Sequence, residues 1–261
     1  MPERQFIKIK IEDRVALVTI DRPPVNALNS QTMSELAAVL TELSQNSEVK
    51  VLVLTGGGSY AFVAGADIKE IDQLKSPEAA EAIAKKGQAV LNQIEQLEKP
   101  AIAAINSVCL GGGNELAMAC HLRIASDRAR FGQPEINLGI IPGFGGTQRL
   151  ARLVGPSKAR ELILTGDVIS AQEALRIGLV DRLVPDGELL RQAVGLAKKI
   201  ASRGAVAIKL SLQAIREGLA LPLEEGLARE AALFAQAVKT DDMREGVRAF
   251  FEKRQPKFQD R

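Results

Sequence analysis

One stretch, Ile105 to Leu150, constrains this chain more than any other, because glycines interrupt its regular structure twice. The run Ala101–Ile105 is typical of a strand, and three glycines, Gly111 to Gly113, follow it. Glycine permits positive φ and lets the backbone come close to a ligand. A short helical pattern, Glu115–Cys120, comes next, and the first N–H groups of a helix lack intrahelical acceptors. The stretch is therefore predicted to present backbone donors to an anion or an oxyanion.

Two carboxylates lie in the same stretch. Glu115 stands at the predicted helix start, and Glu135 follows 20 residues later (135 − 115) in the segment FGQPEINLG. Backbone donors and two carboxyl groups in one partly apolar segment indicate acid–base chemistry on a polarised carbonyl. A glycine triplet alone is usually a turn, and a lone Glu at a helix start usually serves the helix dipole. The residues by themselves therefore leave a purely structural role open.

Composition excludes several classes of function. The chain has 261 residues, 46% of them hydrophobic, enough for one large core with or without a helical appendage. The net charge is +2 without long runs of one sign, so nucleic acid is not an expected partner. The charged start, residues 1–14, contains no apolar signal segment, and no run approaches the roughly 20 apolar residues of a membrane span. Two cysteines without a CxxC pattern fit a reducing compartment, and we expect a cytoplasmic protein.

The order of predicted elements indicates the fold class. Strands alternate with helices up to about residue 188, beginning with a hairpin formed by residues 6–11 and 15–20. From residue 189 onward only helices are predicted: 189–202, 205–218, 223–239 and 242–253. This order predicts an α/β core, residues 1–188, and a C-terminal helical region, residues 189–261.

Other kinds of site are not supported by the residues. A Ser-His-Asp site would need His121, the single histidine, which follows Cys120 at the end of an apolar run. Cys109, Cys120 and His121 do not have zinc spacing, so no metal site is expected. The loop Ala64–Asp67 combines glycine with small residues and could also present backbone donors, although a plain strand-to-helix connection is the simpler interpretation.

Five segments together resemble the crotonase superfamily, and within it the enoyl-CoA hydratase/isomerase family, over nearly the whole chain. They are AFVAGADIKE, NSVCLGGGNELAMAC, FGQPEINLGIIPGFGGTQRL, LTGDVISAQEALRIGLVDRLVP and EGVRAFFEKRQPKF. The resemblance implies a spiral of ββα units whose C-terminal helices mediate trimerisation, often into a hexamer made of two trimers. It also implies an acyl-CoA thioester as substrate, and neither a metal nor a redox cofactor is required.

The resemblance assigns roles residue by residue. It implies that the thioester oxygen lies between the backbone N–H groups of Ala66 and Gly112, and that Glu115 and Glu135 are the paired catalytic glutamates. The substrate-binding residues that it implies are Ala66, Asp67, Ile68, Lys69, Gly112, Gly143, Phe250 and Lys253. Phe250 and Lys253 are implied to lie near the nucleotide end of coenzyme A, often in the site of a neighbouring subunit.

The reaction expected is reversible addition of water to trans-2-enoyl-CoA, giving 3-hydroxyacyl-CoA. Glu115 is assigned to the water as base and Glu135 to the α-carbon as acid, and the two roles could be exchanged. Two alternatives stay open. An enoyl-CoA isomerase can work with one carboxylate, and some crotonase homologues bind RNA without catalysis. The retention of both glutamates favours hydration over isomerisation, and the balanced charge argues against RNA binding.

Overall fold

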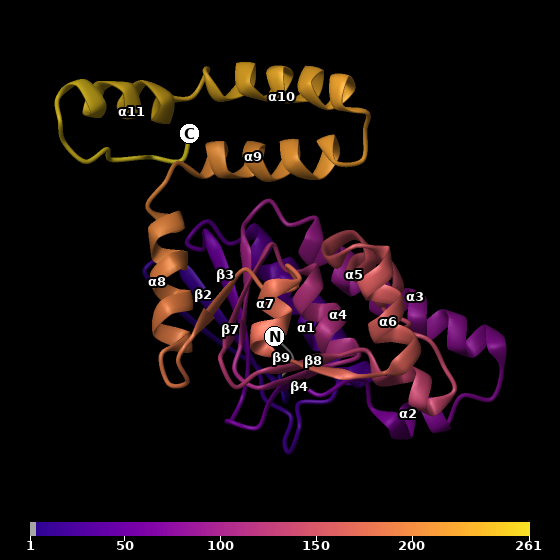
Figure 1. Ribbon diagram of the computed structural model, residues 1–261. Helices are drawn as coiled ribbons and strands as arrows, with labels where there is room; N and C mark the ends of the chain where they lie inside the picture. The colour runs from indigo at the N-terminus through magenta and orange to yellow at the C-terminus, as the bar shows by residue number, and fades with distance from the viewer. Residues whose placement is uncertain (1–3) are drawn as a thin grey trace.

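A six-stranded sheet forms the centre of the molecule in the computed structural model, which describes residues 4–261 (Figure 1). Residues 1–3, the beginning of the charged N-terminal segment, lie outside the described residues. The strand order is β1-β2-β3-β5-β7-β10; β1 and β2 form the predicted antiparallel hairpin, and the other neighbours are parallel. The strands are β1 (Ile7–Glu12), β2 (Val15–Ile20), β3 (Val51–Gly56), β5 (Ala101–Ile105), β7 (Leu122–Ser126) and β10 (Arg182–Val184).

A smaller, four-stranded sheet lies beside the first and was not predicted from the sequence. Its order is β4-β6-β8-β9, with β4 (Ala61–Val63), β6 (Val108–Leu110), β8 (Arg130–Gly132) and β9 (Val168–Ser170). Along the chain, β3, β5 and β7 of the large sheet are each followed by a strand of the small sheet and then by helices. This succession is the spiral of ββα units that the resemblance implies.

Helices occupy the remaining regular structure. Their bounds are α1 (Ser30–Gln45), α2 (Ile68–Asp72), α3 (Pro77–Glu95), α4 (Gly112–Ala119), the 3₁₀ helix η1 (Pro134–Leu138), α5 (Gly146–Val154), α6 (Pro156–Thr165), α7 (Ala171–Arg176), α8 (Leu189–Ala201), α9 (Ala205–Gly218), α10 (Leu223–Ala237) and α11 (Asp241–Phe251). In the part of the chain that the structure describes, no helix is both long and apolar enough to cross a membrane.

The central strands are buried on both faces, which explains their continuous apolar runs. In β3, Leu52 and Leu54 belong to the larger core cluster, together with buried residues of α1 and α3. Val51 and Val53, on the opposite face, belong to a second cluster that includes Ala193 and Ala197 of α8. The predicted boundary between the α/β core and the C-terminal helical region, at residues 188 and 189, stays a prediction. In the structure the first helix after it, α8, packs against the large sheet.

Helices α9, α10 and α11 form a layer beside the α/β body (Figure 1). The C-terminal segment connects this layer to the body through two carboxylates. Asp242 at the start of α11 is buried and accepts hydrogen bonds from the N–H groups of Gln259 and Asp260, at 2.6 and 2.9 Å. Asp260 accepts from Ala205 N at 3.0 Å and forms an ion pair with the buried Lys50, which immediately precedes β3.

The predicted start of one helix is wrong. The pattern predicts a helix from Glu115, after all three glycines of the Gly111–Gly113 triplet, but α4 begins at Gly112. Gly111 alone lies outside, with φ +50, a conformation that residues with a side chain rarely adopt. Gly113 lies inside the helix, at a point where a Cβ would overlap the Val63 carbonyl oxygen of β4. Close packing of α4 on the small sheet therefore requires this glycine.

Candidate active site

The N–H group of Gly112 is one of two backbone donors at the centre of the molecule. Gly112 is the first residue of α4, where N–H groups have no intrahelical acceptor, and it is buried. The left-handed turn at Gly111 brings the chain from β6 into α4 at this point. The N–H of Glu115 bonds to the Gly111 carbonyl oxygen at 2.9 Å, which anchors the first turn of the helix.

The second donor is the N–H group of Ala66. On either side of it, Gly65 O accepts from Leu28 N and Asp67 N donates to Leu28 O, each at 2.8 Å. Successive N–H groups of an extended segment point in opposite directions, so the N–H of Ala66 points away from Leu28. Its nitrogen lies 3.4 Å from where a Cβ of Gly112 would be. The structure therefore brings together the two residues predicted to form the oxyanion hole.

Glu115 is a buried carboxyl group, with only 2% of its surface exposed. Its Oε1 accepts hydrogen bonds from Phe144 N at 2.8 Å and Gly146 N at 2.6 Å, both from the glycine-rich entry to α5. Burial raises the pKa of Glu115 to about 7, helped by the nearby charge of Glu135 and opposed by the two N–H donors. Such a group can gain or lose a proton near neutral pH.

Glu135 lies in η1, close to the same point. Its Oε1 lies 2.7 Å from where a Cβ of Gly111 would be, so only glycine at 111 leaves room for this carboxyl group. Burial raises the pKa of Glu135 as well. Among residues 4–261 its buried Oε2 has no hydrogen-bond partner. An unpaired buried oxygen of this kind costs free energy and is available to a ligand.

Sequence reasoning missed Gln133, which is fully buried two residues before Glu135. With its amide nitrogen facing the two carbonyls, Gln133 donates to Gly132 O and Gly111 O, each at 3.0 Å. The Gly111 carbonyl belongs to the same peptide as the Gly112 N–H, so Gln133 helps to fix the direction of that donor. The buried polar residue in FGQPE was the available signal.

The predicted turn after Ala66 forms the short helix α2. Asp67 caps it by accepting from Lys69 N at 3.0 Å, and an ion pair with Arg22 lowers the pKa of the Asp67 carboxyl group. Ile68 and Lys69 are exposed, with 60% of the surface of Ile68 accessible. Gly143 lies in the loop that precedes Phe144, next to the Glu115 carboxyl group. Asp67, Ile68 and Lys69 therefore directly follow the Ala66 donor in the chain, and Gly143 directly precedes the residue whose N–H binds Glu115.

Two predicted substrate-binding residues lie elsewhere in the chain. Phe250 belongs to α11 and Lys253 follows it, in the helical layer rather than in the body (Figure 1). Phe250 is 79% exposed, and its ring meets the Phe251 ring edge-on at 5.8 Å. Within one copy of the chain the structure does not bring these residues to Glu115.

The chemistry of the site follows from its parts. Two backbone N–H donors can stabilise negative charge on one oxygen, and one buried and one partly buried carboxyl group can move protons on either side of it. Among residues 4–261 no group of three or more His, Cys, Asp or Glu side chains could hold a metal ion.

Comparison with known proteins decides the family. A sequence model described as "Enoyl-CoA hydratase/isomerase" matches residues 10–261. The chain belongs to the enoyl-CoA hydratase/isomerase family. The family predicted from the sequence is thereby confirmed.

Relatives within the enoyl-CoA hydratase/isomerase family cover the chain almost completely. The short-chain-enoyl-CoA hydratase of Clostridium acetobutylicum is 49% identical over 97% of both chains. The crotonyl-CoA hydratase of Syntrophomonas wolfei is 47% identical over 97% of both. The crystal structure of an enoyl-CoA hydratase from Bacillus anthracis matches with a TM-score of 0.95 and 40% identity, covering 98% of this chain and 100% of that one. The predicted α/β crotonase-like fold is thereby confirmed.

Proposed function

We propose that this protein hydrates short trans-2-enoyl-CoA thioesters, using the N–H groups of Ala66 and Gly112 and the carboxyl groups of Glu115 and Glu135. The predicted reaction class, a hydro-lyase acting on enoyl-CoA, is confirmed by the hydratases to which the chain is similar. The observation that supports the residue roles is the convergence of two backbone donors, the buried carboxyl group of Glu115 and the partly buried one of Glu135.

Polarisation of the thioester is the first requirement of the reaction. Water attacks the β-carbon of a conjugated thioester when negative charge can accumulate on the carbonyl oxygen. The N–H groups of Ala66 and Gly112 are fixed by the backbone before substrate arrives, so stabilising this charge costs no reorganisation. A single donor of this type is worth roughly 3 kcal/mol in known oxyanion holes.

Proton transfer is the second requirement. Both hydrogen bonds to the Glu115 carboxylate end on Oε1, so Oε2 is the oxygen assigned to the attacking water. Glu115, whose pKa is about 7, accepts the proton of that water. Glu135, whose pKa is also raised, is protonated more readily than an exposed Glu and delivers a proton to the α-carbon. Isomerisation would need only one of these groups, which is why hydration is the favoured reaction.

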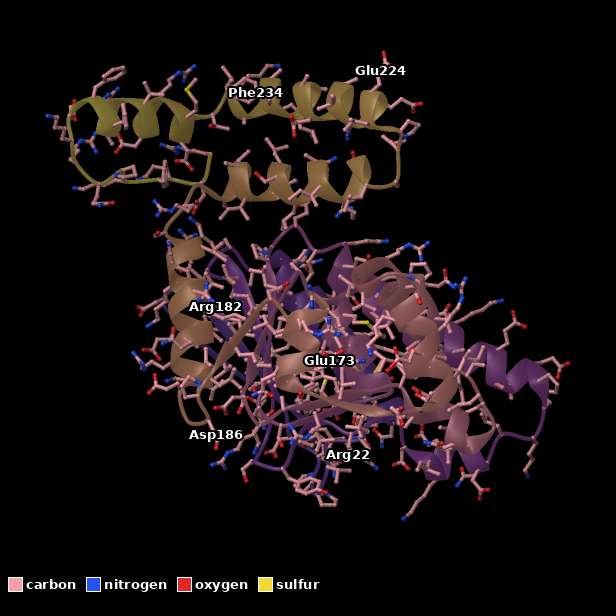
Figure 2. All side chains as sticks on the ribbon, in the orientation of Figure 1. Arg22, Glu173, Arg182, Asp186, Glu224 and Phe234 are labelled. Carbon is pink, nitrogen blue, oxygen red and sulfur yellow. The ribbon has the colours of Figure 1, made fainter. Side chains whose placement is uncertain are left out.

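The proposed assembly is a trimer, or a hexamer of two trimers, in the cytoplasm. Support comes from large apolar side chains that stay exposed on the helical layer, namely Ile215, Leu219, Leu223, Leu227, Phe234, Phe250 and Phe251. Phe234 is 70% exposed and extends from α10 (Figure 2). Apolar surface of this extent is typical of a protein interface. A second copy of this chain is the proposed occupant, and light scattering on the purified protein would measure the assembly.

The residue roles are tested by replacing each glutamate with glutamine. Gln keeps a carbonyl oxygen for the Phe144 and Gly146 N–H groups but cannot transfer a proton. Glu115→Gln and Glu135→Gln are each expected to lower kcat for crotonyl-CoA hydration by at least about 10²-fold, the usual loss for general acid–base catalysis. Glu161→Gln, on the exposed face of α6, is the matched control and should leave kcat unchanged. Near wild-type kcat in either of the first two variants would refute the two-carboxylate mechanism.

A further inference from the structure

Helix α3 lies directly beside the loop that holds Glu115. A Cβ on Gly87 of α3 would overlap the ring of Phe144, so this glycine lets the loop pack against the helix. The same ring lies 3.5 Å from where a Cβ of Gly112 would be. Phe144 therefore packs between α3 and the oxyanion donor, and its backbone cannot move without disturbing both.

The peptide that joins Gly143 to Phe144 is hydrogen-bonded at both ends. Its carbonyl oxygen accepts from Nε2 of Gln88 on α3 at 2.9 Å. Its N–H donates to Oε1 of Glu115 at 2.8 Å. Hydrogen bonds in such a chain polarise one another, so a donor at the carbonyl end strengthens the N–H at the other end. Gln88 thus acts on the Glu115 carboxylate through one intervening peptide.

The next peptide is held from the same helix face. Nη1 of Arg149 donates to Phe144 O at 2.9 Å, and its Nε and Nη2 bind Glu95 Oε2 at 3.1 and 2.9 Å. Nη2 also donates to Asn92 Oδ1. Residues 88, 92 and 95 follow helical spacing and share one face of α3. Both carbonyl groups that flank the Phe144 residue, those of Gly143 and Phe144 itself, are therefore fixed from the side of α3, while the Phe144 N–H binds Glu115 on the other side.

We propose that Gln88 is a positioning residue of the hydratase: it fixes the Gly143–Phe144 peptide so that the N–H of Phe144 holds the Glu115 carboxylate with one oxygen directed at the water. Arg149, anchored by Asn92 and Glu95, binds the carbonyl oxygen of Phe144 and so fixes the same residue from its other end. The inference rests on the proposed role of Glu115 as the base. By this inference, a residue in the middle of α3, far from the glutamates in sequence, positions the base of the reaction.

The protonation of Glu115 gives a readout that a merely structural role would not change. The charged groups that face this carboxyl group are Glu135, which favours its protonated form, and Arg149, which favours its ionised form. The N–H groups of Phe144 and Gly146 also favour the ionised form. Without the Gln88 amide the Phe144 N–H becomes a weaker donor, so the pKa of Glu115 should rise further. Because the base must be ionised, the acidic limb of the pH–rate profile should move to higher pH.

The experiment compares Gln88→Met with Gln93→Met. Both replacements exchange an amide of α3 for a side chain of similar length, but Gln93 donates to Thr41 Oγ1 on α1 and lies away from the loop. We expect Gln88→Met to lower kcat for crotonyl-CoA by about tenfold, the factor that corresponds to one hydrogen bond. Its acidic limb should move up by as much as about one pH unit, and its KM should change little. Gln93→Met should keep the wild-type kcat and pH profile.

A wild-type pH profile for Gln88→Met, with kcat within about twofold of wild type, would overturn the inference. If that variant does not fold, Arg149→Lys replaces it, because Lys keeps the charge but cannot bind Phe144 O, Asn92 and Glu95 together. The acidic limb of its pH–rate profile is then expected to move to higher pH, and an unchanged limb would overturn the inference. Glu115→Gln is measured in parallel. An active Glu115→Gln refutes the proposed function and this inference together, whereas an inactive one beside an unchanged Gln88→Met refutes the positioning role alone.

Discussion

Glu115 combines two opposing effects in a single side chain. Burial favours the neutral acid, while two backbone N–H groups favour the carboxylate, and the outcome is a pKa of about 7. Either effect alone would leave the group permanently neutral or permanently charged at neutral pH. A carboxyl group with such a pKa is suited to the proposed role of Glu115, as a base in one direction of a reversible reaction and as an acid in the other.

The raised pKa of Glu115 predicts how stability depends on pH. The unfolded chain ionises this group at its ordinary pKa of 4.5, but the folded protein retains the proton until about 7. Ionisation of Glu115 therefore makes a contribution that lowers the folding stability of the wild type as pH rises from 4.5 through 7. Glu115→Gln has no proton to lose, so its stability relative to wild type should increase over that range by up to about 3 kcal/mol. Denaturant unfolding at several pH values measures this, with Glu161→Gln as control. A constant difference across the range would contradict the assigned pKa.

Residues that belong to short motifs could be predicted from the sequence, but the residues that hold them in place by hydrogen bonds could not. Glu115 and Glu135 were singled out because glycines and carboxylates occur together within one stretch, and the structure places them close together. Gln88 was missed because its partner, Gly143, is 55 residues away and nothing local distinguishes Gln88 from a solvated helix residue. Gln133 was visible only as a polar residue in a partly apolar segment. Supports of this kind depend on tertiary contacts, which a single sequence does not contain.

At the scale of elements, α4 is unusual because all of its residues are buried, from Gly112 to Ala119. A helix buried on every side must meet backbone as well as side chains, and at Gly113 it meets the carbonyl group of Val63 in β4. The small sheet and α4 therefore fix each other's position. This contact places both the Gly112 N–H and Glu115, because both lie in the first turn of the helix.

A pair of glycine substitutions tests this contact. Gly113→Ala should destabilise the protein by about 2 kcal/mol or more, because the added methyl group would overlap a backbone oxygen that cannot move aside. Gly195→Ala on α8 is the matched change, since nothing lies within 4 Å of its added Cβ. It should raise the free energy of unfolding by about 0.5–1 kcal/mol, the helix propensity difference between Gly and Ala. Equal effects of the two substitutions would show that α4 does not pack as described.

The C-terminal helices were predicted well, whereas the strands of the small sheet were not predicted as a sheet. The bounds of α9, residues 205 to 218, are those expected. The strands of the small sheet contain only three residues each, too few to show the alternation by which a strand is recognised. The start of α4 was placed too late because three glycines normally end a helix, whereas here packing overrides propensity.

At the scale of the whole molecule, the site and the helical layer belong to different parts of one chain. Glu115 and Ala66 lie in the body, while Phe250 and Lys253 are at the far end of the sequence, in and just after α11 (Figure 1). If the layer completes the site of a neighbouring copy, as proposed, each active site is built from two chains. Binding of the nucleotide end of coenzyme A then depends on assembly, whereas the chemistry at the thioester depends on the body alone.

Lys253→Ala tests that division. An ammonium group suits the phosphates of coenzyme A as a point charge, so its loss should raise KM for crotonyl-CoA, with a smaller effect on kcat. Interactions that bind substrate and transition state equally behave in this way. A crotonyl-pantetheine thioester, which lacks the nucleotide, should be hydrated by the variant and by wild type with similar kinetics. Equal losses on both substrates would assign Lys253 a structural role instead.

The two N–H groups that bind Glu115 have a further consequence, for isotope exchange. Phe144 and Gly146 lie in or at the end of a glycine-rich loop, where amide hydrogens normally exchange rapidly with deuterated water. Here both are held by a buried carboxylate, so they should exchange as slowly as the hydrogen-bonded interior of a helix. Protonation of Glu115 weakens both bonds, and protection should fall below pH 7 relative to the later amides of α5, residues 150–154. These two amides would then report the charge of the base in the resting protein, with no substrate present.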